Sequence, residues 1–151
     1  MVDYRRLRLS NLTSKEFRHV FLLLAWVVIG IVFYTLETIP RPYFHPMWCP
    51  LDDLIPFCEW FIIPYLFWFV YLIGMHIYLA LVDVPAFKRF MYFIILIHAV
   101  TLVVYALYPN CQELRVVDFP RDNILSRMVA DFYAFDTNTN VCPSLHCLSS
   151  M

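Results

Sequence analysis

Three residues near the end of the chain have types and spacing that suit phosphate chemistry. Pro143, Ser144 and His146 stand in the order Pro-Ser-x-His, just after a polar segment. A serine hydroxyl can donate to a phosphate oxygen, and a nearby histidine can pass a proton to a leaving oxygen. Free amides at a helix start also attract an anion, and proline suits the first turn, so we expect Pro143 there. Taken alone, this spacing also fits an ordinary helix start with an incidental histidine.

Other ionisable side chains have a structural interpretation that we favour over a functional one. His76 and His98 fall within apolar runs, where neutral imidazoles hydrogen-bonded inside a helix bundle are favoured over a functional site. Asp52, Asp53 and Glu59 precede the second apolar run. Acidic side chains are common at helix starts, and a metal or substrate site is the alternative.

The cysteines leave two possibilities open. The chain has five, at positions 49, 58, 111, 142 and 147, and the first four fall outside the apolar runs. Four such residues could form two disulfides in three pairings, or remain as small apolar side chains. Cys-x-x-Cys spacing is absent from the sequence, so we expect no zinc, and we expect no cofactor.

The elements that must position these residues are membrane-spanning helices. Apolar residues make up 62% of the 151 and charged residues only 15%, far from the balance of a soluble domain. Each of three uncharged stretches is as long as the roughly 17–25 residues that a helix needs to cross a bilayer. Strands in an open sheet would leave backbone amides unpaired in lipid. The sequence therefore predicts one all-α membrane bundle over residues 1–151, with three full spans and the start of a fourth; the full spans lie near 19–37, 60–82 and 88–108.

Basic residues predict the orientation of these helices. Five of them lie in the N-terminal 19 residues, and Lys88 and Arg89 lie in the predicted turn Asp83–Arg89, where Pro85 should break the helix. The positive-inside rule puts both clusters in the cytoplasm and the segment 109–142 on the outer face of the cell membrane. The net charge of −1 argues against a nucleic-acid partner.

Shorter patterns predict the local elements. Thr13 and Glu16 have the spacing of a capping box for the first helix. A short helical piece is expected over Leu51–Phe57, and the cluster Asp136–Asn140 suits a turn or a helix entry. Between them, five apolar residues at helical spacing predict an amphipathic helix at the membrane surface: Ile124, Leu125, Met128, Val129 and Phe132.

Two stretches resemble a known family. Pro120–Asn123, followed by Asp136–His146, is similar to the middle of the type-2 phosphatidic acid phosphatase superfamily, in particular its compact bacterial membrane members. Upstream, Pro50–Tyr65 resembles the entry to the second span of that subgroup. The likeness runs from about Arg18 to the end of the chain.

The resemblance implies a metal-independent phosphatase acting on lipid phosphates or isoprenyl diphosphates, with its site on the outer face of a six-helix core. Ser144 would then bind phosphate and His146 would act as the general acid. Arg115 matches the arginine of the family's first signature, although Val116 stands where that signature has proline. Tyr108 stands where the first signature has lysine, and Arg121 is a further candidate base for binding phosphate. A phospholipid or sphingolipid headgroup transferase would use the same residues.

The family's third signature, which carries the nucleophilic histidine, has no counterpart in this sequence. A covalent mechanism needs that nucleophile, so we expect a chain truncated before the third signature and inactive as it stands. Its partners would be membrane lipids, a lipid phosphate substrate, and missing helices or another copy of the chain. The alternative is a non-enzymatic membrane remnant or interaction protein.

Overall fold

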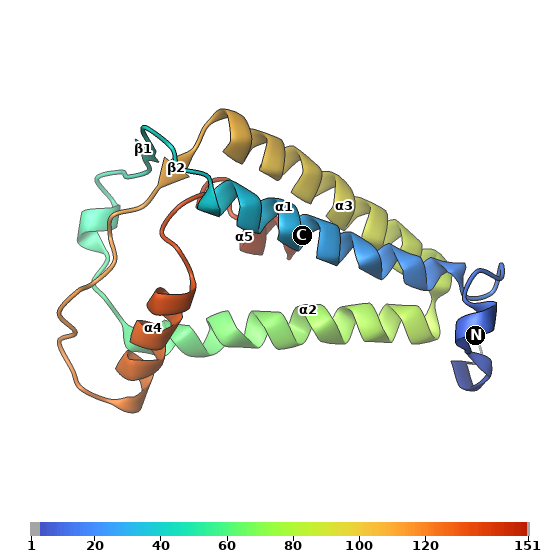
Figure 1. The fold of residues 1–151 in the computed structure, drawn as a ribbon. Coiled ribbons are helices and arrows are strands. Elements are labelled where there is room, and N and C mark those ends of the chain that lie inside the picture. The colour runs from blue at the N-terminus through green and yellow to red at the C-terminus, as the bar shows by residue number, and fades with distance from the viewer. Residues whose placement is uncertain (1–3, 151) are drawn as a thin grey trace.

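Three long helices form the body of the molecule. The computed structural model describes residues 4–150. The helices are α1 (Leu24–Thr38), which continues the 3-10 segment Arg18–Leu23, α2 (Ile62–Val82), which follows the 3-10 turn Glu59–Phe61, and α3 (Val84–Leu107). Figure 1 shows α1 beside α3, with α2 along the other side of the bundle. Each is long and apolar enough to cross a membrane, counted as Arg18–Thr38, Glu59–Val82 and Val84–Leu107, so the predicted number of such helices is confirmed.

The predicted start of the first helix is wrong. The Thr13–Glu16 capping box does not form, because the carbonyl of Ser14 accepts from the backbone N–H of Phe17 and of Arg18 and closes a turn there. The helix begins only after this turn.

The third helix starts earlier than predicted, and the turn Asp83–Arg89 does not exist. Asp83 caps α3, and its Oδ1 accepts from the backbone N–H of Ala86 at 3.0 Å. Pro85 therefore lies in the first turn, where a missing N–H costs no hydrogen bond. Lys88 and Arg89 belong to the beginning of α3.

A polar cluster joins the three helices inside the bundle. Trp26 Nε1 donates to His76 Nε2 at 2.9 Å, and the edge of the indole packs against His98, with 5.0 Å between ring centroids. The Nδ1 atoms of His76 and His98 lie 2.7 and 2.9 Å from the carbonyl oxygens of Leu72 and Ile94. Because His76 Nε2 accepts, its proton is on Nδ1 and the ring is neutral. The expectation of buried, hydrogen-bonded histidines is confirmed.

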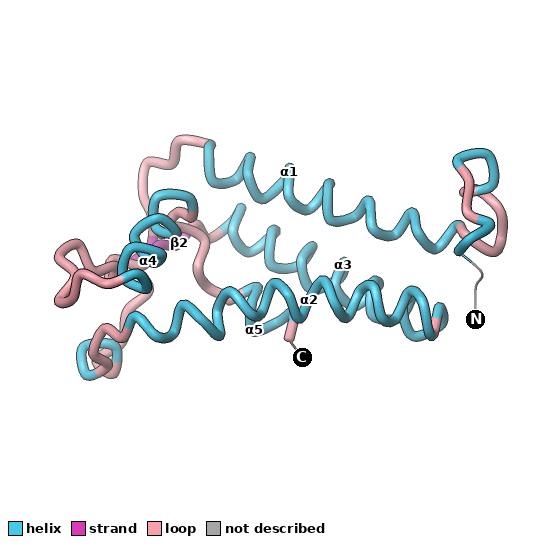
Figure 2. The backbone as a smooth tube through the Cα atoms, turned by 90° about the horizontal axis from the view of Figure 1, so that it is seen from below, coloured by secondary structure: helices cyan, strands magenta, loops and turns pink. Residues whose placement is uncertain are grey.

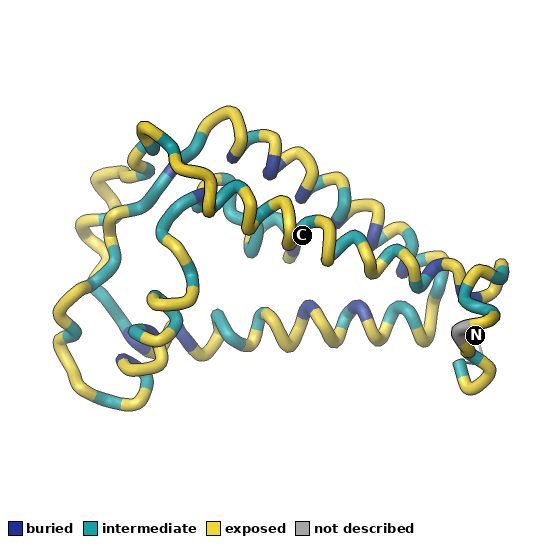
Figure 3. Tube along the Cα trace, in the orientation of Figure 1, coloured by how far each residue is buried: buried dark blue, intermediate teal, exposed yellow. Residues whose placement is uncertain are grey.

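The outside of the bundle is covered by apolar side chains. Exposed positions follow the whole length of α1 and α2 (Figure 3). Val28 and Ile31 on α1 are 61% and 62% exposed, and Phe67 on α2 is 63% exposed. Such a continuous apolar surface is unfavourable in water and suits a hydrocarbon environment.

The two long connecting segments lie at one end of the bundle. We call this end, comprising residues 39–58 and 108–144, the loop end. Strand β1 (His45–Pro46) pairs in parallel with β2 (Asn110–Cys111). Asp52–Leu54 forms a 3-10 turn, shorter than the helical piece predicted there. The N-terminal residues lie at the opposite end, and the helix α4 (Ile124–Phe135) lies across the loop end (Figure 2).

The predicted amphipathic helix is confirmed as α4 (Ile124–Phe135). The side chain of Asn123 caps it by accepting from the backbone N–H of Ser126 at 2.9 Å. Only part of the predicted apolar stripe is covered: Val129 is buried, whereas Ile124 is 74% exposed.

Replacing Trp26 by phenylalanine should lower the free energy of unfolding by about 1–2 kcal/mol, because His76 loses its donor while most ring packing remains. Thermal unfolding of the detergent-solubilised chain, followed by far-ultraviolet circular dichroism, measures the change. Trp60→Phe is the control, because the Trp60 side chain is 61% exposed. Equal effects of the two substitutions would contradict a role for the Trp26–His76 bond.

Candidate functional site

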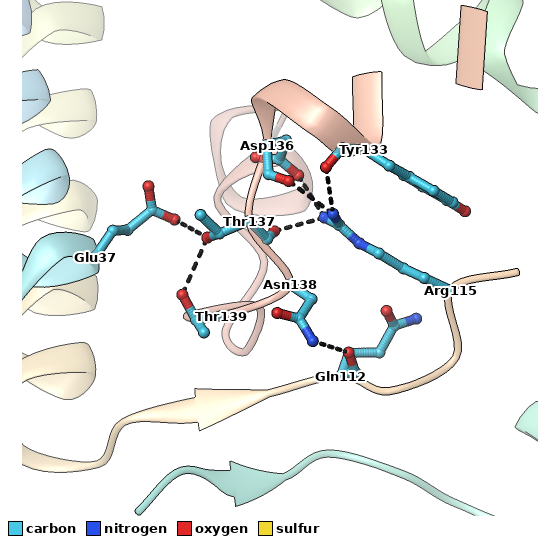
Figure 4. Close-up of polar contacts among 8 residues, drawn as sticks. All are labelled: Glu37, Gln112, Arg115, Tyr133, Asp136, Thr137, Asn138 and Thr139. Atoms are coloured by element: carbon cyan, nitrogen blue, oxygen red, sulfur yellow. Dashed lines mark hydrogen bonds and ion pairs between the residues drawn. The ribbon is translucent and has the colours of Figure 1, made fainter. Parts of the chain in front are cut away.

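Arg115 holds the end of α4. Its Nη1 donates to the carbonyl oxygens of Tyr133 and Asp136 at 3.1 and 2.7 Å, and its Nη2 donates to that of Thr137 at 2.6 Å. Nη2 also forms an ion pair with Asp136 Oδ2 at 3.1 Å (Figure 4). The guanidinium carbon lies 4.6 Å from the Tyr133 ring centroid. The last carbonyls of a helix carry partial negative charge, so this cation stabilises the end of α4.

The link that follows α4 is tied on two sides (Figure 4). On one side, Thr137 Oγ1 donates to Glu37 Oε1 at the end of α1 and lies 3.0 Å from Thr139 Oγ1. On the other side, Asn138 Nδ2 donates to the carbonyl oxygen of Gln112, and Gln112 N donates to that of Asn138, both at 2.9 Å. The link is therefore held between the first helix and the strand segment.

Asn110 is fully buried and fixes the backbone that leads to Ser144. Its Oδ1 accepts from the backbone N–H groups of Val141 and Cys142, both at 2.9 Å. Its Nδ2 donates to the carbonyl oxygens of Cys142 and Tyr108, at 2.7 and 3.1 Å. An amide side chain supplies donors and an acceptor together, which no apolar or carboxylate side chain can do.

Ser144 caps the short helix α5 (Leu145–Ser149), and its Oγ accepts from Cys147 N at 3.4 Å. Pro143 precedes this cap, so its predicted place in the first turn is wrong. The reason is tertiary: the Tyr105 hydroxyl donates to the Pro143 carbonyl at 2.6 Å and holds it outside the helix. The predicted start of a fourth span has five helical residues, packed against α3; Ser150, which follows them, accepts from Trp68 Nε1 of α2.

His146 is surrounded by aromatic rings of α2. The ring centroids of Tyr65, Trp68 and Phe69 lie 4.7, 4.4 and 5.8 Å from that of the imidazole. Nε2 is buried and has no hydrogen-bond partner within residues 4–150. Burial lowers the pKa of His146 below its ordinary 6.5, and the nearby carboxylate of Asp136 opposes this shift. The imidazole is therefore neutral at neutral pH.

Asp136 connects two of the predicted site residues. It pairs directly with Arg115, and a positive charge on His146 would lower the pKa of its carboxyl. Burial raises the pKa of the Asp136 carboxyl, while the charges of Arg115 and His146 act in the opposite direction. We call these three residues the Arg115–Asp136–His146 cluster.

Arg121 does not belong to this cluster. Its Nη1 lies 3.1 Å from Glu59 Oε1, which also accepts from Asn123 Nδ2 at 2.9 Å. The Glu59 side chain is buried, so this ion pair joins the beginning of α4 to the beginning of α2. Arg121 thus lies at the opposite end of α4 from the carbonyl groups that Arg115 contacts. In this arrangement Arg121 is paired with Glu59, and its role as a further phosphate-binding base stays a prediction.

The acidic residues ahead of α2 have separate partners. Asp52 Oδ2 accepts from Cys49 N at 2.8 Å, and Asp53 Oδ1 accepts from Trp48 Nε1 at 3.1 Å. Within residues 4–150, no three His, Cys, Asp or Glu side chains gather in an arrangement that could hold a metal ion. All five cysteines are free thiols.

Sequence reasoning missed Glu37, Asn110 and Asp136 as residues that organise the site. Asn110 had a local signal, since it is a polar residue directly after the Tyr108-Pro109 helix end. Asp136 was recognised only as part of a turn. Its contact with Arg115 joins positions 21 residues apart, which no local pattern encodes.

No protein-family model, curated protein or solved structure matches the chain. The residues and their geometry therefore carry the functional argument.

Replacing Asn110 by alanine should loosen the backbone from Val141 to Ser144, because the N–H groups of Val141 and Cys142 lose their acceptor. Each unsatisfied group costs about 1–3 kcal/mol. Hydrogen exchange of these amides in detergent, read by mass spectrometry, should accelerate strongly. Asn138→Ala is the graded comparison, because that side chain donates only to the Gln112 carbonyl. Unchanged protection in Asn110→Ala would argue against Asn110 as the organiser of this segment.

The lowered pKa of His146 predicts a pH dependence of stability. The unfolded chain takes up a proton at His146 near 6.5, whereas the folded chain does so only at lower pH. The unfolded state then binds more protons, so the free energy of unfolding should decrease as the pH falls below about 6.5. Titration of the imidazole by nitrogen-15 NMR should give a midpoint below that value, and His146→Gln should remove this part of the pH dependence. A midpoint at or above 6.5 is the contrary result.

Proposed function

We propose that the chain spans the cell membrane three times, with its N-terminus in the cytoplasm and the loop end outside. The basic residues support this orientation. Arg5, Arg6 and Arg8 precede the first span, and Lys88 and Arg89 begin α3 at the same end of the bundle. Positive charge is characteristic of cytoplasmic flanks.

We further propose that the Arg115–Asp136–His146 cluster handles the phosphate group of a lipid. The observation that carries this proposal is the ion pair that the Arg115 guanidinium forms with the Asp136 carboxylate at 3.1 Å. The planar guanidinium binds carboxylate and phosphate oxygens in the same way. The Asp136 carboxylate thus occupies a position that suits a phosphate oxygen, and a substrate has to displace it from Arg115.

His146 would supply the proton. A neutral imidazole cannot act as an acid, but a phosphate dianion beside it raises its pKa and favours the charged form. The imidazolium can then protonate the leaving oxygen. The buried Nε2, which lacks a partner within the described residues, is the nitrogen available for this transfer. Ser144, two residues before His146, keeps its hydroxyl proton free to donate to a phosphate oxygen.

The function we propose is that of a membrane phosphatase-like protein, similar to hydrolases of lipid phosphates or isoprenyl diphosphates. A headgroup transferase would share the steps and differ in the acceptor. The rings that contact His146 within the described residues are those of Tyr65, Trp68 and Phe69, with no second histidine. A covalent mechanism needs a nucleophile, so these residues alone should give no turnover.

A non-enzymatic role is the second candidate, and one observation favours it. Both Nη atoms of Arg115 are engaged by the end of α4 and by Asp136, as in a purely structural cap. In that case Arg115 would stabilise α4 and bind no anion.

Inorganic phosphate should separate the two candidates. If the cluster binds phosphate, the His146 midpoint measured in lipid nanodiscs should rise by about one pH unit, the size expected for a nearby opposite charge. Arg115→Gln should abolish this rise. Arg127→Gln is the matched control, because Arg127 pairs with Asp122 on the exposed side of α4. A midpoint that phosphate does not move would favour the structural candidate.

Turnover is a separate measurement. Release of phosphate from phosphatidic acid and from farnesyl diphosphate should stay at background for the purified 151-residue chain. Saturable release that His146→Gln abolishes would overturn the expected inactivity, while supporting the phosphatase assignment.

A further inference from the structure

An apolar groove runs along the bundle between α1 and α3, with a volume of about 570 Å³. Every residue that lines it is Ala, Val, Ile or Leu. The groove exists because small side chains, among them Ala25, Ala99 and Ala106, stand between larger branched ones and leave space beside them.

The length of the groove suits a lipid tail. On α1 it extends from Ala25 to Leu36, which is roughly 16 Å of helix at 1.5 Å per residue. One leaflet of a bilayer has about 15 Å of hydrocarbon, half of a core of about 30 Å. An extended acyl chain parallel to the helices can therefore fill it.

A cation stands at the loop end of this groove. Arg41 follows α1, and its Nη1 donates to the carbonyl oxygen of Ala106, one of the residues that line the groove, at 3.2 Å. Nε of Arg41 is shielded from solvent and lacks a hydrogen-bond partner in the described part of the chain. Within residues 4–150, no carboxylate forms an ion pair with Arg41. A carbonyl is a neutral acceptor, so the charge of Arg41 is left without a counter-ion.

We propose that this groove binds an anionic phospholipid of the surrounding bilayer, with one acyl chain between α1 and α3 and the phosphate paired with Arg41. The occupant follows from two complementary features: a wholly apolar channel of leaflet length, and an uncompensated guanidinium at its end. Guanidinium and phosphate form strong charge-assisted hydrogen bonds. The proposal rests on the membrane placement proposed above and is independent of the Arg115–Asp136–His146 cluster.

Native mass spectrometry of the full chain tests the charge. The detergent-purified protein is exposed to phosphatidylglycerol and to phosphatidylcholine with the same acyl chains. One arginine near a membrane surface should favour the anionic lipid about fivefold. Arg41→Gln should remove this preference and Arg41→Lys should keep most of it. Arg127→Gln, which breaks an exposed ion pair with Asp122, should leave it unchanged. Each of these variants is also measured in an Arg115→Gln background, so that an anionic lipid held by the cluster does not contribute to the preference.

Filling the groove tests the acyl chain. Ala99→Phe should reduce the retention of both lipids at least several-fold, because the added ring occupies the channel. Val100→Phe is the control at the neighbouring position, which is 56% exposed and does not line the groove. Circular dichroism of every variant checks that the helices are intact.

Three results would overturn the proposal. The first is equal retention of the two lipids by the unmodified chain. The second is a preference that persists in Arg41→Gln, or lipid retention that Ala99→Phe does not change. The third is a dimer that Ala99→Phe dissociates without loss of lipid, because a second copy of the chain would then cover the groove.

Discussion

The arrangement of the loop end depends on the buried side chain of Asn110. This residue lies in β2, shortly after the end of α3, and its amide holds the backbone of residues 141 and 142 through three hydrogen bonds. Its own backbone pairs with β1 and with the returning chain at Asn140. The strand pair, the link after α4 and the approach to Ser144 thus converge on one residue. An unsatisfied amide at such a buried position is costly, which favours a single arrangement.

The same charges serve stability and the proposed chemistry. Arg115 neutralises the carbonyl end of α4 and pairs with Asp136, so an anion can bind it only by competing with contacts that the fold already makes. His146 is kept neutral by burial among aromatic rings, although a proton donor must be charged. Under the proposed function, binding of phosphate and protonation of His146 would therefore favour one another.

The three long helices could be predicted because their signal is local and strong. In lipid, a long run of uncharged residues has to form a helix, because its backbone hydrogen bonds must be satisfied within the segment. The helical periodicity of apolar residues around Val129 was a similar local signal, and the structure has a helix there, α4. Helix starts were predicted less well, since Thr13 and Asp83 are equally plausible caps by composition, and only Asp83 forms the bond. The pairing of Arg121 with the buried Glu59 could not be predicted, because it joins residues that are distant in the chain.

By itself, the sequence determined the number of apolar helices, the amphipathic helix and the residue types able to handle phosphate. These properties follow from composition and periodicity along a continuous stretch. The tertiary structure alone decided that Asp136 pairs with Arg115, that Tyr105 keeps Pro143 out of the last helix, and that Arg41 reaches α3. Each of these contacts joins residues that are distant in the chain, and hydrogen bonds and ion pairs form only when packing brings their atoms within about 3 Å.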